Sequence, residues 1–290
     1  MSDTPPPADL AVRLGQLRTE IDAIDEEVHR LLVARSAIID ELIKVKRTDV
    51  TGAAFRPARE ADMMRRLVAR HRGILPIIAL EHMWREIVST FTFLQAHYEV
   101  HLDGGRDPVA MRDLARFYCG FTVPAHMLPG PDEVIEAVAA SVSDLGIIRL
   151  SQPSWVGAWW NRLGGEGPRV ITRLPYIDMP GRVADLPALV VSNPISEPIA
   201  PEVDILACSG VGDRDPARAL ADAGIELLAR HDEGPRAEFL IAIPAAQDRA
   251  TVPAAFAAAG VEVRTPRVVG GYPAPIRLPA GPPARSAPAD

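Results

Sequence analysis

The sequence lacks several features that mark large classes of proteins. Only two of its 290 residues are cysteines, Cys119 and Cys208, and neither they nor the seven histidines have the spacing of metal ligands. The sequence therefore predicts neither a disulfide framework nor a metal site, and we expect two buried thiols in a reducing cytoplasm. The formal net charge of −7 argues against a nucleic-acid-binding surface, because such surfaces are usually basic.

Long hydrophobic runs are also absent. No apolar stretch reaches the roughly 20 residues that span a bilayer, although a hydrophobic content of 48% is ample for buried cores. The first residues, MSDTPPPADL, contain neither a basic segment nor an apolar one, so we expect no secretory signal. These absences favour a cytoplasmic protein without membrane, nucleic acid or cofactor partners, and the length allows two or three small domains.

What the sequence does contain is a long amphipathic repeat near its N-terminus. Between about Asp9 and Lys46, apolar residues alternate by three and four, which is the heptad pattern of helices that pack along a seam. The seam consists of Leu14, Leu17, Ile21, Ile24, Val28, Leu31, Ile38, Leu42 and Val45. The pattern predicts one very long helix.

Cations occupy special places on this helix. Arg35 stands at the seam position after Leu31, where burial without an anionic partner would cost several kcal/mol. Lys46 lies three helical turns further, about 16 Å along the axis, so the two side chains can hold a small dianion between them. Arg18 lies about 42 Å from Lys46 on the same rise, so it can join that site only from another copy of the chain.

Two shorter helices are predicted to follow. One begins at Pro57, since proline is favoured in a first helical turn, and stops at Gly73. The other begins near Pro76 and carries a core stripe of Ile77, Leu80, Trp84, Ile87, Phe91 and Leu94. Because these helices cannot cover the long seam alone, we expect a homodimer with interlocked long helices.

This arrangement resembles the all-helical chorismate mutases over about residues 10–97. The resemblance rests on spaced polar residues: Arg18 in QLRTEIDAID, Arg35 in LLVARS, Lys46 in IKVKR, Arg59 and Glu60 in FRPARE, and Gln95 in REIVSTFTFLQ. It implies an isomerase of the shikimate pathway that converts chorismate to prephenate for phenylalanine and tyrosine biosynthesis. That pericyclic reaction needs a held conformer and charge stabilisation, but no metal, nucleophile or proton transfer.

The resemblance also assigns roles. It implies that Arg35 and the partner chain's Arg18 clamp carboxylates, and that Lys46 serves a carboxylate and the ether oxygen. Gln95 would donate to the ether oxygen from the other side, and Glu60 would accept from the ring hydroxyl. Arg59 is either a substrate contact or structural support. We take Lys46, Gln95 and Arg35 as the catalytic residues and all six as substrate-binding.

Each assignment has a structural alternative. Arg35 could pair with an acid across the dimer, and Lys46 could be an ordinary cation at a helix C-terminus. Arg18 and Gln95 could be surface residues, and Glu60 could be an acid favoured in a first helical turn.

Two positions depart from the family pattern. Phe91 replaces a small polar residue that faces a carboxylate in many relatives, and it also belongs to the apolar stripe of its helix. Arg56 stands where some members have an acid. Neither change removes the six residues above, but both are expected to lower substrate affinity.

After His97 the pattern becomes α/β. Residues 98–200 resemble a shortened, degenerate prephenate dehydratase region, with DLGIIRLSQP and LPALVVSN in place of that family's strands. Leu186, Pro187 and Ala188 replace its Thr-Arg-Phe motif, so we expect no dehydratase activity. Predicted elements are strands 98–102, 145–150, 170–174 and 186–192, and helices 108–119 and 131–140.

Residues 201–278 resemble an ACT module, with the order strand, helix, strand, strand, helix, strand and the ending VVGGYP. The expected elements are 203–208, 216–223, 225–229, 237–243, 252–259 and 261–268. The module lacks that family's amino-acid-binding motifs. Residues 1–8 and 279–290 are rich in proline or alanine, and we expect them to be disordered.

The sequence thus predicts a multidomain α plus α/β chain: a three-helix mutase domain over 9–97, a dehydratase-like region over 98–200 and an ACT-like module over 201–278. The predicted function is chorismate mutase. Alternatives are a bifunctional chorismate mutase–prephenate dehydratase, a ligand-sensing regulatory protein on a mutase scaffold, and a mutase acting on isochorismate. An aromatic amino acid effector stays open as well.

Overall fold

The structure is a computed structural model, which describes residues 8–46, 55–151, 154, 156–195, 201–212 and 214–279. It divides into two compact units, Met1–Thr51 and Gly52–Asp290. Each unit is described by itself below.

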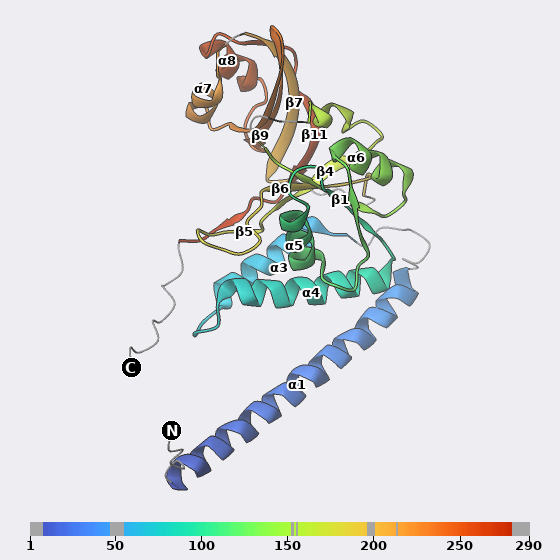
Figure 1. The fold of residues 1–290 in the computed structure, drawn as a ribbon, viewed down its shortest axis with the longest axis vertical. Helices are drawn as coiled ribbons and strands as arrows, with labels where there is room; N and C mark the ends of the chain where they lie inside the picture. The colour runs from blue at the N-terminus through green and yellow to red at the C-terminus, as the bar shows by residue number, and fades with distance from the viewer. Residues whose placement is uncertain are drawn as a thin grey trace. The chain divides into compact units, whose positions relative to one another are not determined.

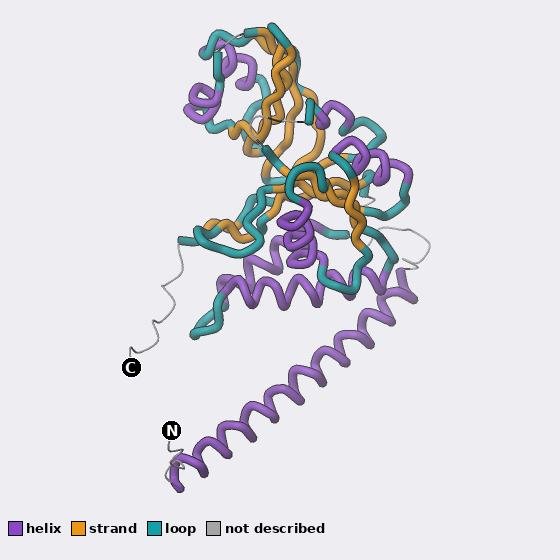
Figure 2. The backbone as a smooth tube through the Cα atoms, in the orientation of Figure 1, coloured by secondary structure: helices purple, strands orange, loops and turns teal. Residues whose placement is uncertain are grey.

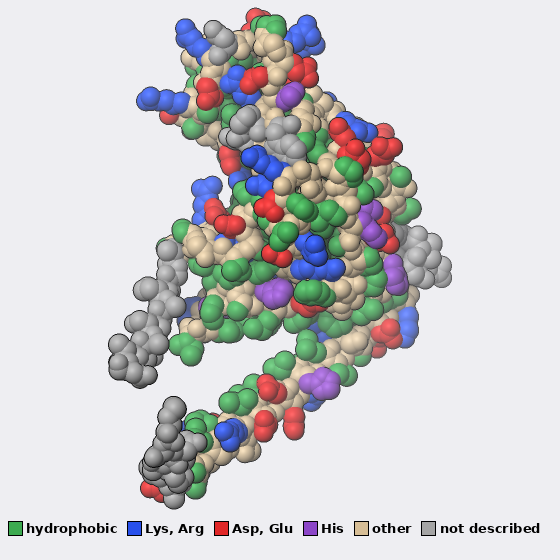
Figure 3. Space-filling view, viewed as in Figure 1, with side chains coloured by type: hydrophobic (Ala, Val, Ile, Leu, Met, Phe, Trp, Pro, Cys, Tyr) green, Lys and Arg blue, Asp and Glu red, His purple; other side chains and the backbone are tan. Residues whose placement is uncertain are grey.

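The first unit contains the predicted long helix. Helix α1 spans Ala8–Lys46, 39 residues, which corresponds to about 58 Å of helix axis. Its seam side chains are exposed: Ile24 is 62% and Ile38 is 67% accessible to solvent. Figure 3 shows hydrophobic side chains along its length. A single helix cannot bury such a seam, so within its unit α1 is an incomplete packing element.

The second unit begins with the other two helices of the predicted mutase domain. Helix α3 spans Pro57–Arg70, with the proline in its first turn as predicted, and it buries Pro57, Ala61, Met64 and Leu67. Helix α4 spans Ile77–Gln95. Helix α4 lies beside α5 (Pro108–Cys119), as Figure 1 shows.

Helix α4 packs with a different face from the one that its sequence suggests. The buried residues are Ile78, Glu81, Arg85, Val88, Ser89 and Thr92. The predicted apolar stripe is only half-buried, and its last member, Leu94, is 49% exposed. At 3.6 residues per turn the two faces are roughly a third of a turn apart. The prediction that the apolar stripe forms the buried face of α4 was wrong. The apolar residues of a helix do not by themselves determine which of its faces packs against the rest of the unit.

The strands that support these helices, orange in Figure 2, form a sheet with parallel and antiparallel pairs. Strand β1 (Val100–Asp103) pairs in parallel with β2 (Ala125–Leu128) and β3 (Leu145–Arg149). Strand β6 (Ala188–Ser192) then pairs antiparallel with both β3 and β4 (Arg169–Leu174). The short strand β2 was not predicted; it consists of four residues and pairs only with β1.

Helices cover both faces of this part of the sheet. Leu145 and Ile147 of β3 pack in one core cluster with α5, whereas Ile148 packs in another with α6 (Pro131–Ala140). This alternation follows from the period of two in a strand. Phe55 and Ile78 join the α5 cluster, so the N-terminal helices share the core of the α/β sheet. A one-turn helix, η1 (Trp159–Arg162), completes the α6 side.

The C-terminal elements occur in the predicted order. They are β7 (Val203–Val211), α7 (Ala217–Asp222), β8 (Glu226–Glu233), β9 (Arg236–Pro244), α8 (Thr251–Ala258), β10 (Glu262–Val263) and β11 (Arg267–Tyr272). Strand β7 pairs with β9 on one side and with both β10 and β11 on the other. The single strand expected over 261–268 is in fact two, because Pro266 between them has no N–H to donate to a ladder.

One close contact joins the two parts of the sheet. Gly270 of β11 pairs in parallel with Val170 of β4, and a Cβ at Gly270 would lie 2.3 Å from the Val170 carbonyl oxygen. The VVGGYP ending therefore allows the strands to approach. A second small sheet pairs β5 (Ile177–Asp178) with β12 (Ile276–Arg277).

Among the described residues, no helix combines the length and the apolar character that crossing a membrane requires. None of the His, Cys, Asp and Glu side chains of these residues form a group of three or more that could hold a metal ion.

Candidate active site

The predicted site residues are divided between the units. Arg18, Arg35 and Lys46 all lie on α1, in the first unit. Arg35 is half-buried although most of the residues around it are exposed. Lys46 is the last residue of α1, and its side chain lies outside the described residues. The 17- and 11-residue spacings of these cations are kept on one continuous helix.

The other three residues lie in the second unit. Arg59 and Glu60 are in the first turn of α3, where Arg59 is exposed and Glu60 is half-buried. Gln95 ends α4, and its side-chain amide donates to the Phe91 carbonyl oxygen at 2.9 Å. Arg56 is the N-cap of α3, and its carbonyl oxygen accepts from the Glu60 N–H at 3.0 Å, the first backbone hydrogen bond of that helix.

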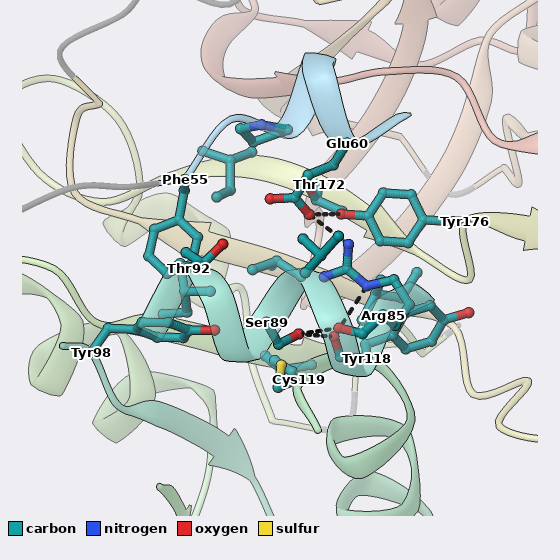
Figure 4. Close-up of a pocket in the computed structure, with 17 residues that line it drawn as sticks. Phe55, Glu60, Arg85, Ser89, Thr92, Tyr98, Tyr118, Cys119, Thr172 and Tyr176 are labelled. Atoms are coloured by element: carbon teal, nitrogen blue, oxygen red, sulfur yellow. Dashed lines mark hydrogen bonds and ion pairs between the residues drawn. The ribbon is translucent and has the colours of Figure 1, made fainter. Parts of the chain in front are cut away.

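Glu60 takes part in a buried ion pair that the sequence did not suggest. Arg85 of α4 donates from Nη1 to Glu60 Oε2 at 2.6 Å, and the two side chains are only 8% and 14% exposed. The Tyr176 hydroxyl donates to the same oxygen at 3.4 Å. Figure 4 shows these groups converging above α4.

Arg85 is held by further contacts. Its Nε donates to the Tyr118 carbonyl oxygen at 3.1 Å, and its guanidinium carbon lies 4.9 Å from the centre of the Tyr176 ring. Burial alone would lower the pKa of Arg85, but Tyr176 and Glu60 more than offset it, so that pKa is raised above its ordinary value. Arg85 is therefore charged at any physiological pH.

A second buried network lies one turn earlier on α4. Glu81 is fully buried, and Arg182 Nη2 approaches its Oε2 to 3.2 Å, an ion pair without hydrogen-bond geometry. The same Nη2 donates to the Tyr118 hydroxyl at 2.7 Å. Burial raises the pKa of Glu81, and the nearby Arg182 and Arg85 only partly offset this effect. Both networks therefore connect α4 to residues of the α/β part of the chain, namely Tyr118, Tyr176 and Arg182.

A small cavity lies beside the Glu60–Arg85 pair (Figure 4). Its volume is about 40 Å³, and polar groups from α3, α4 and the α/β elements line it together with apolar ones. Liquid water occupies roughly 30 Å³ per molecule, so the space suits about one water or a single hydroxyl group, and not a whole ring. Glu60, Ser89, Thr92, Thr172 and Tyr176 are among the lining residues, but Gln95 is not.

The structure does not bring Gln95 to the cavity that Glu60 lines. Gln95 ends α4, whereas Thr92, three residues earlier, is a lining residue. The first turn of α3 holds the sequence neighbours Arg59 and Glu60 together.

Sequence reasoning missed Arg85, Tyr118 and Tyr176. A signal existed for Arg85, since Glu81, Arg85 and Ser89 recur every four residues and so share one helix face. Nothing in the sequence pointed to Tyr176, which lies in the loop between β4 and β5.

Comparison with known proteins finds a family match over part of the chain. Residues 17–96 match the family model described as chorismate mutase type II. These residues, the mutase segment, contain all six predicted site residues.

Curated relatives share this similarity. The bifunctional chorismate mutase/prephenate dehydratase of Aquifex aeolicus is 28% identical over 141 residues, which cover 47% of this chain and 38% of that protein. The enzyme of the same name from Neisseria gonorrhoeae is 36% identical over 72 residues, 25% of this chain and 19% of that protein. The chain therefore spans less than two fifths of the length of either relative.

One solved structure aligns beyond the mutase segment. The prephenate dehydratase from Streptococcus mutans is 14% identical, and the alignment covers 62% of this chain and 99% of that one. The TM-score is 0.35, which is too low to carry an inference.

Proposed function

We propose that the chain is a chorismate mutase, an isomerase that rearranges chorismate to prephenate without a cofactor. The observation that supports this most directly is the family match over residues 17–96, with Arg18, Arg35, Lys46, Arg59, Glu60 and Gln95 at the positions quoted above. The activity and the role of each residue are proposals.

The residues suit the chemistry. Chorismate carries two carboxylates, and its rearrangement moves charge onto the ether oxygen without proton transfer. Arg35 and the Arg18 of a second copy would clamp the carboxylates, and Lys46 and Gln95 would donate to the ether oxygen as charge develops there. The Gln95 amide now donates to the Phe91 carbonyl oxygen and would turn toward the substrate.

A second copy of the chain is part of this proposal. The exposed seam of α1 lacks a partner within its own unit, and Arg18 lies too far along α1 to reach Lys46. Pairing of two α1 helices would cover the seam and bring Arg18 to the other chain's site. The site is then incomplete in a single copy.

The test is the loss of chorismate absorbance with the full-length protein. We expect turnover well above the uncatalysed rate, and a fall of about 100- to 1,000-fold in kcat for Lys46→Ala, the usual effect of removing one transition-state donor. Lys44→Ala is a matched control, because Lys44 is an exposed α1 cation paired with Asp40 at 3.4 Å. Wild-type protein that leaves chorismate unchanged would refute the proposal. Isochorismate in the same assay tests the related substrate.

A second activity is favoured by the names of the relatives, which are bifunctional enzymes. Against it stand Leu186, Pro187 and Ala188, which replace the residues expected of a dehydratase. Phenylpyruvate formed from prephenate at neutral pH, faster than without protein, would establish it.

The C-terminal strand order β8–β9–β7–β11 supports an ACT-like module. Adding phenylalanine, tyrosine or tryptophan to the mutase assay tests whether such an amino acid acts as an effector.

A further inference from the structure

The carboxylate of Glu60 is held from one side only. Both of its partners within the described residues, Arg85 and Tyr176, donate to Oε2. The other oxygen, Oε1, faces the cavity. In Figure 4 one carboxylate oxygen of Glu60 points to Tyr176 and the other points away from it, on the side of Thr92. One oxygen thus fixes the side chain while the second can still accept a hydrogen bond.

Tyr176 belongs to the α/β part of the chain, not to the mutase segment. Burial raises the pKa of its hydroxyl, so that hydroxyl is protonated and acts as a donor. Its ring also lies against the guanidinium of Arg85, 4.9 Å from centre to carbon. The same residue therefore touches both members of the Glu60–Arg85 pair.

The backbone of Tyr176 is fixed from a distant part of the chain. Its carbonyl oxygen accepts from the Ile276 N–H at 2.8 Å, where β12 pairs with β5. Strand β12 follows β11, the last strand of the C-terminal module. A continuous set of contacts thus runs from the end of that module through Tyr176 to Glu60.

We propose that Tyr176 is a positioning residue for the mutase reaction: from outside the mutase segment, it fixes the Glu60 carboxylate so that Oε1 can receive the substrate's ring hydroxyl. The inference rests on the proposed function. It also gives the α/β region a role in that function that does not require the region to be catalytic or to bind an effector.

The proposal predicts a specific kinetic signature. The ring hydroxyl does not change during the rearrangement, so a weaker contact to it affects ground state and transition state alike. Tyr176→Phe removes the hydroxyl and keeps the ring beside Arg85. We expect KM for chorismate to rise about three- to tenfold, the range of one net hydrogen bond, while kcat stays within about twofold.

A double-mutant cycle in the full-length protein separates positioning from a purely structural role. If Tyr176 acts through Glu60, the KM of Tyr176→Phe/Glu60→Gln equals that of Glu60→Gln alone. KM effects that multiply would overturn the proposal. A KM that falls in Tyr176→Phe would also overturn it, since Tyr176 would then compete with the substrate for Glu60.

Tyr272→Phe is the matched control. Tyr272 is fully buried, whereas Tyr176 is half-buried, and the Tyr272 hydroxyl accepts from Nη1 of Arg173, an arginine outside the mutase segment, at 3.2 Å. We expect an unchanged KM. Should Tyr176→Phe fail to unfold cooperatively, Tyr176→Leu, which also removes the hydroxyl, takes its place in the cycle with the same expectation. A wild-type protein without mutase activity would count against the proposed function itself, whereas an active wild type with multiplying KM effects would count against this inference alone.

Discussion

Helices α1 and α4 both contribute to the mutase segment, yet they present opposite kinds of surface. Helix α1 exposes a row of large hydrophobic side chains, with Leu31 and Ile38 more than half accessible. Helix α4 buries Glu81 and Arg85 and leaves its apolar stripe half-buried. An apolar stripe therefore shows where a helix can be covered, but it does not show which partner covers it. Buried charges on α4 are tolerated because partners from other elements pair with them.

The largest expected effect comes from breaking a buried pair on α4. In Arg182→Ala the fully buried Glu81 loses its cation, and the side chains of this pair are only 1% and 0% exposed. Leaving one buried charge alone typically costs about 3–5 kcal/mol. We expect the free energy of unfolding of the second unit, measured by chemical denaturation, to fall by that amount.

Two controls sharpen this prediction. The double variant Glu81→Leu/Arg182→Met should recover most of the lost stability, because no buried charge is left unpaired. Arg162→Ala removes one half of an exposed pair with Asp132, with side chains about half accessible, and should cost no more than about 1 kcal/mol. A double variant as unstable as Arg182→Ala would show that the polar face of α4 is needed for shape and not for charge pairing.

A smaller effect is expected on α1. Ile24 lies on the exposed seam, and if the seam is covered by a second copy, Ile24→Lys should weaken the dimer by about 2 kcal/mol per chain, the value of one buried Ile. Sedimentation over a concentration series would show this as a higher dissociation constant. Val33 is similarly exposed at 58% but lies off the seam, so Val33→Lys should leave association unchanged. Equal effects of the two variants would contradict seam pairing.

Local features of the fold could be predicted where one segment decides the outcome. The pattern from Asp9 to Lys46 predicted α1, and Pro108 and Pro131 marked the starts of α5 and α6. The missed features depend on distant partners. Strand β2 exists because β1 offers an edge, and the buried face of α4 is chosen by Tyr118 and Arg182. Periodicity within α4 contains no information about either.

The candidate site divides in the same way. The positions of Arg18, Arg35 and Lys46 on one helix follow from their spacing alone. The pairing of Glu60 does not, because Arg85 is 25 residues away from it and Tyr176 is 116 residues away. Residue spacing predicts which side chains are neighbours on one helix. The contacts of Glu60 with Arg85 and Tyr176 depend instead on how α3, α4 and the β4–β5 loop pack together.

The smallest expected effect concerns two carboxyls whose pKa values shift in opposite directions. On α1 the hydrogen bonds from Arg30, at 2.6 and 2.7 Å, lower the pKa of the exposed Glu27 below its usual 4.5. On α4 burial raises the pKa of Glu81 above 4.5. Titration of labelled glutamate carboxyl carbons by NMR should place the Glu27 transition below that of Glu81, with Glu27→Gln and Glu81→Gln identifying the two signals.

The sign of each contribution to stability follows from linkage. The lowered pKa of Glu27 gives a contribution that is present above pH 4.5 and is lost on acidification through the folded pKa. The raised pKa of Glu81 gives a contribution to stability that is fully present below pH 4.5. This contribution is lost as the pH rises through the pKa of Glu81 in the folded protein. Glu81→Gln should therefore flatten the fall in stability above pH 4.5, and Glu27→Gln should flatten the weaker loss below it. If both carboxyls titrated near 4.5, the α4 face would be solvated, and the contrast between the two helices would rest on their apolar residues alone.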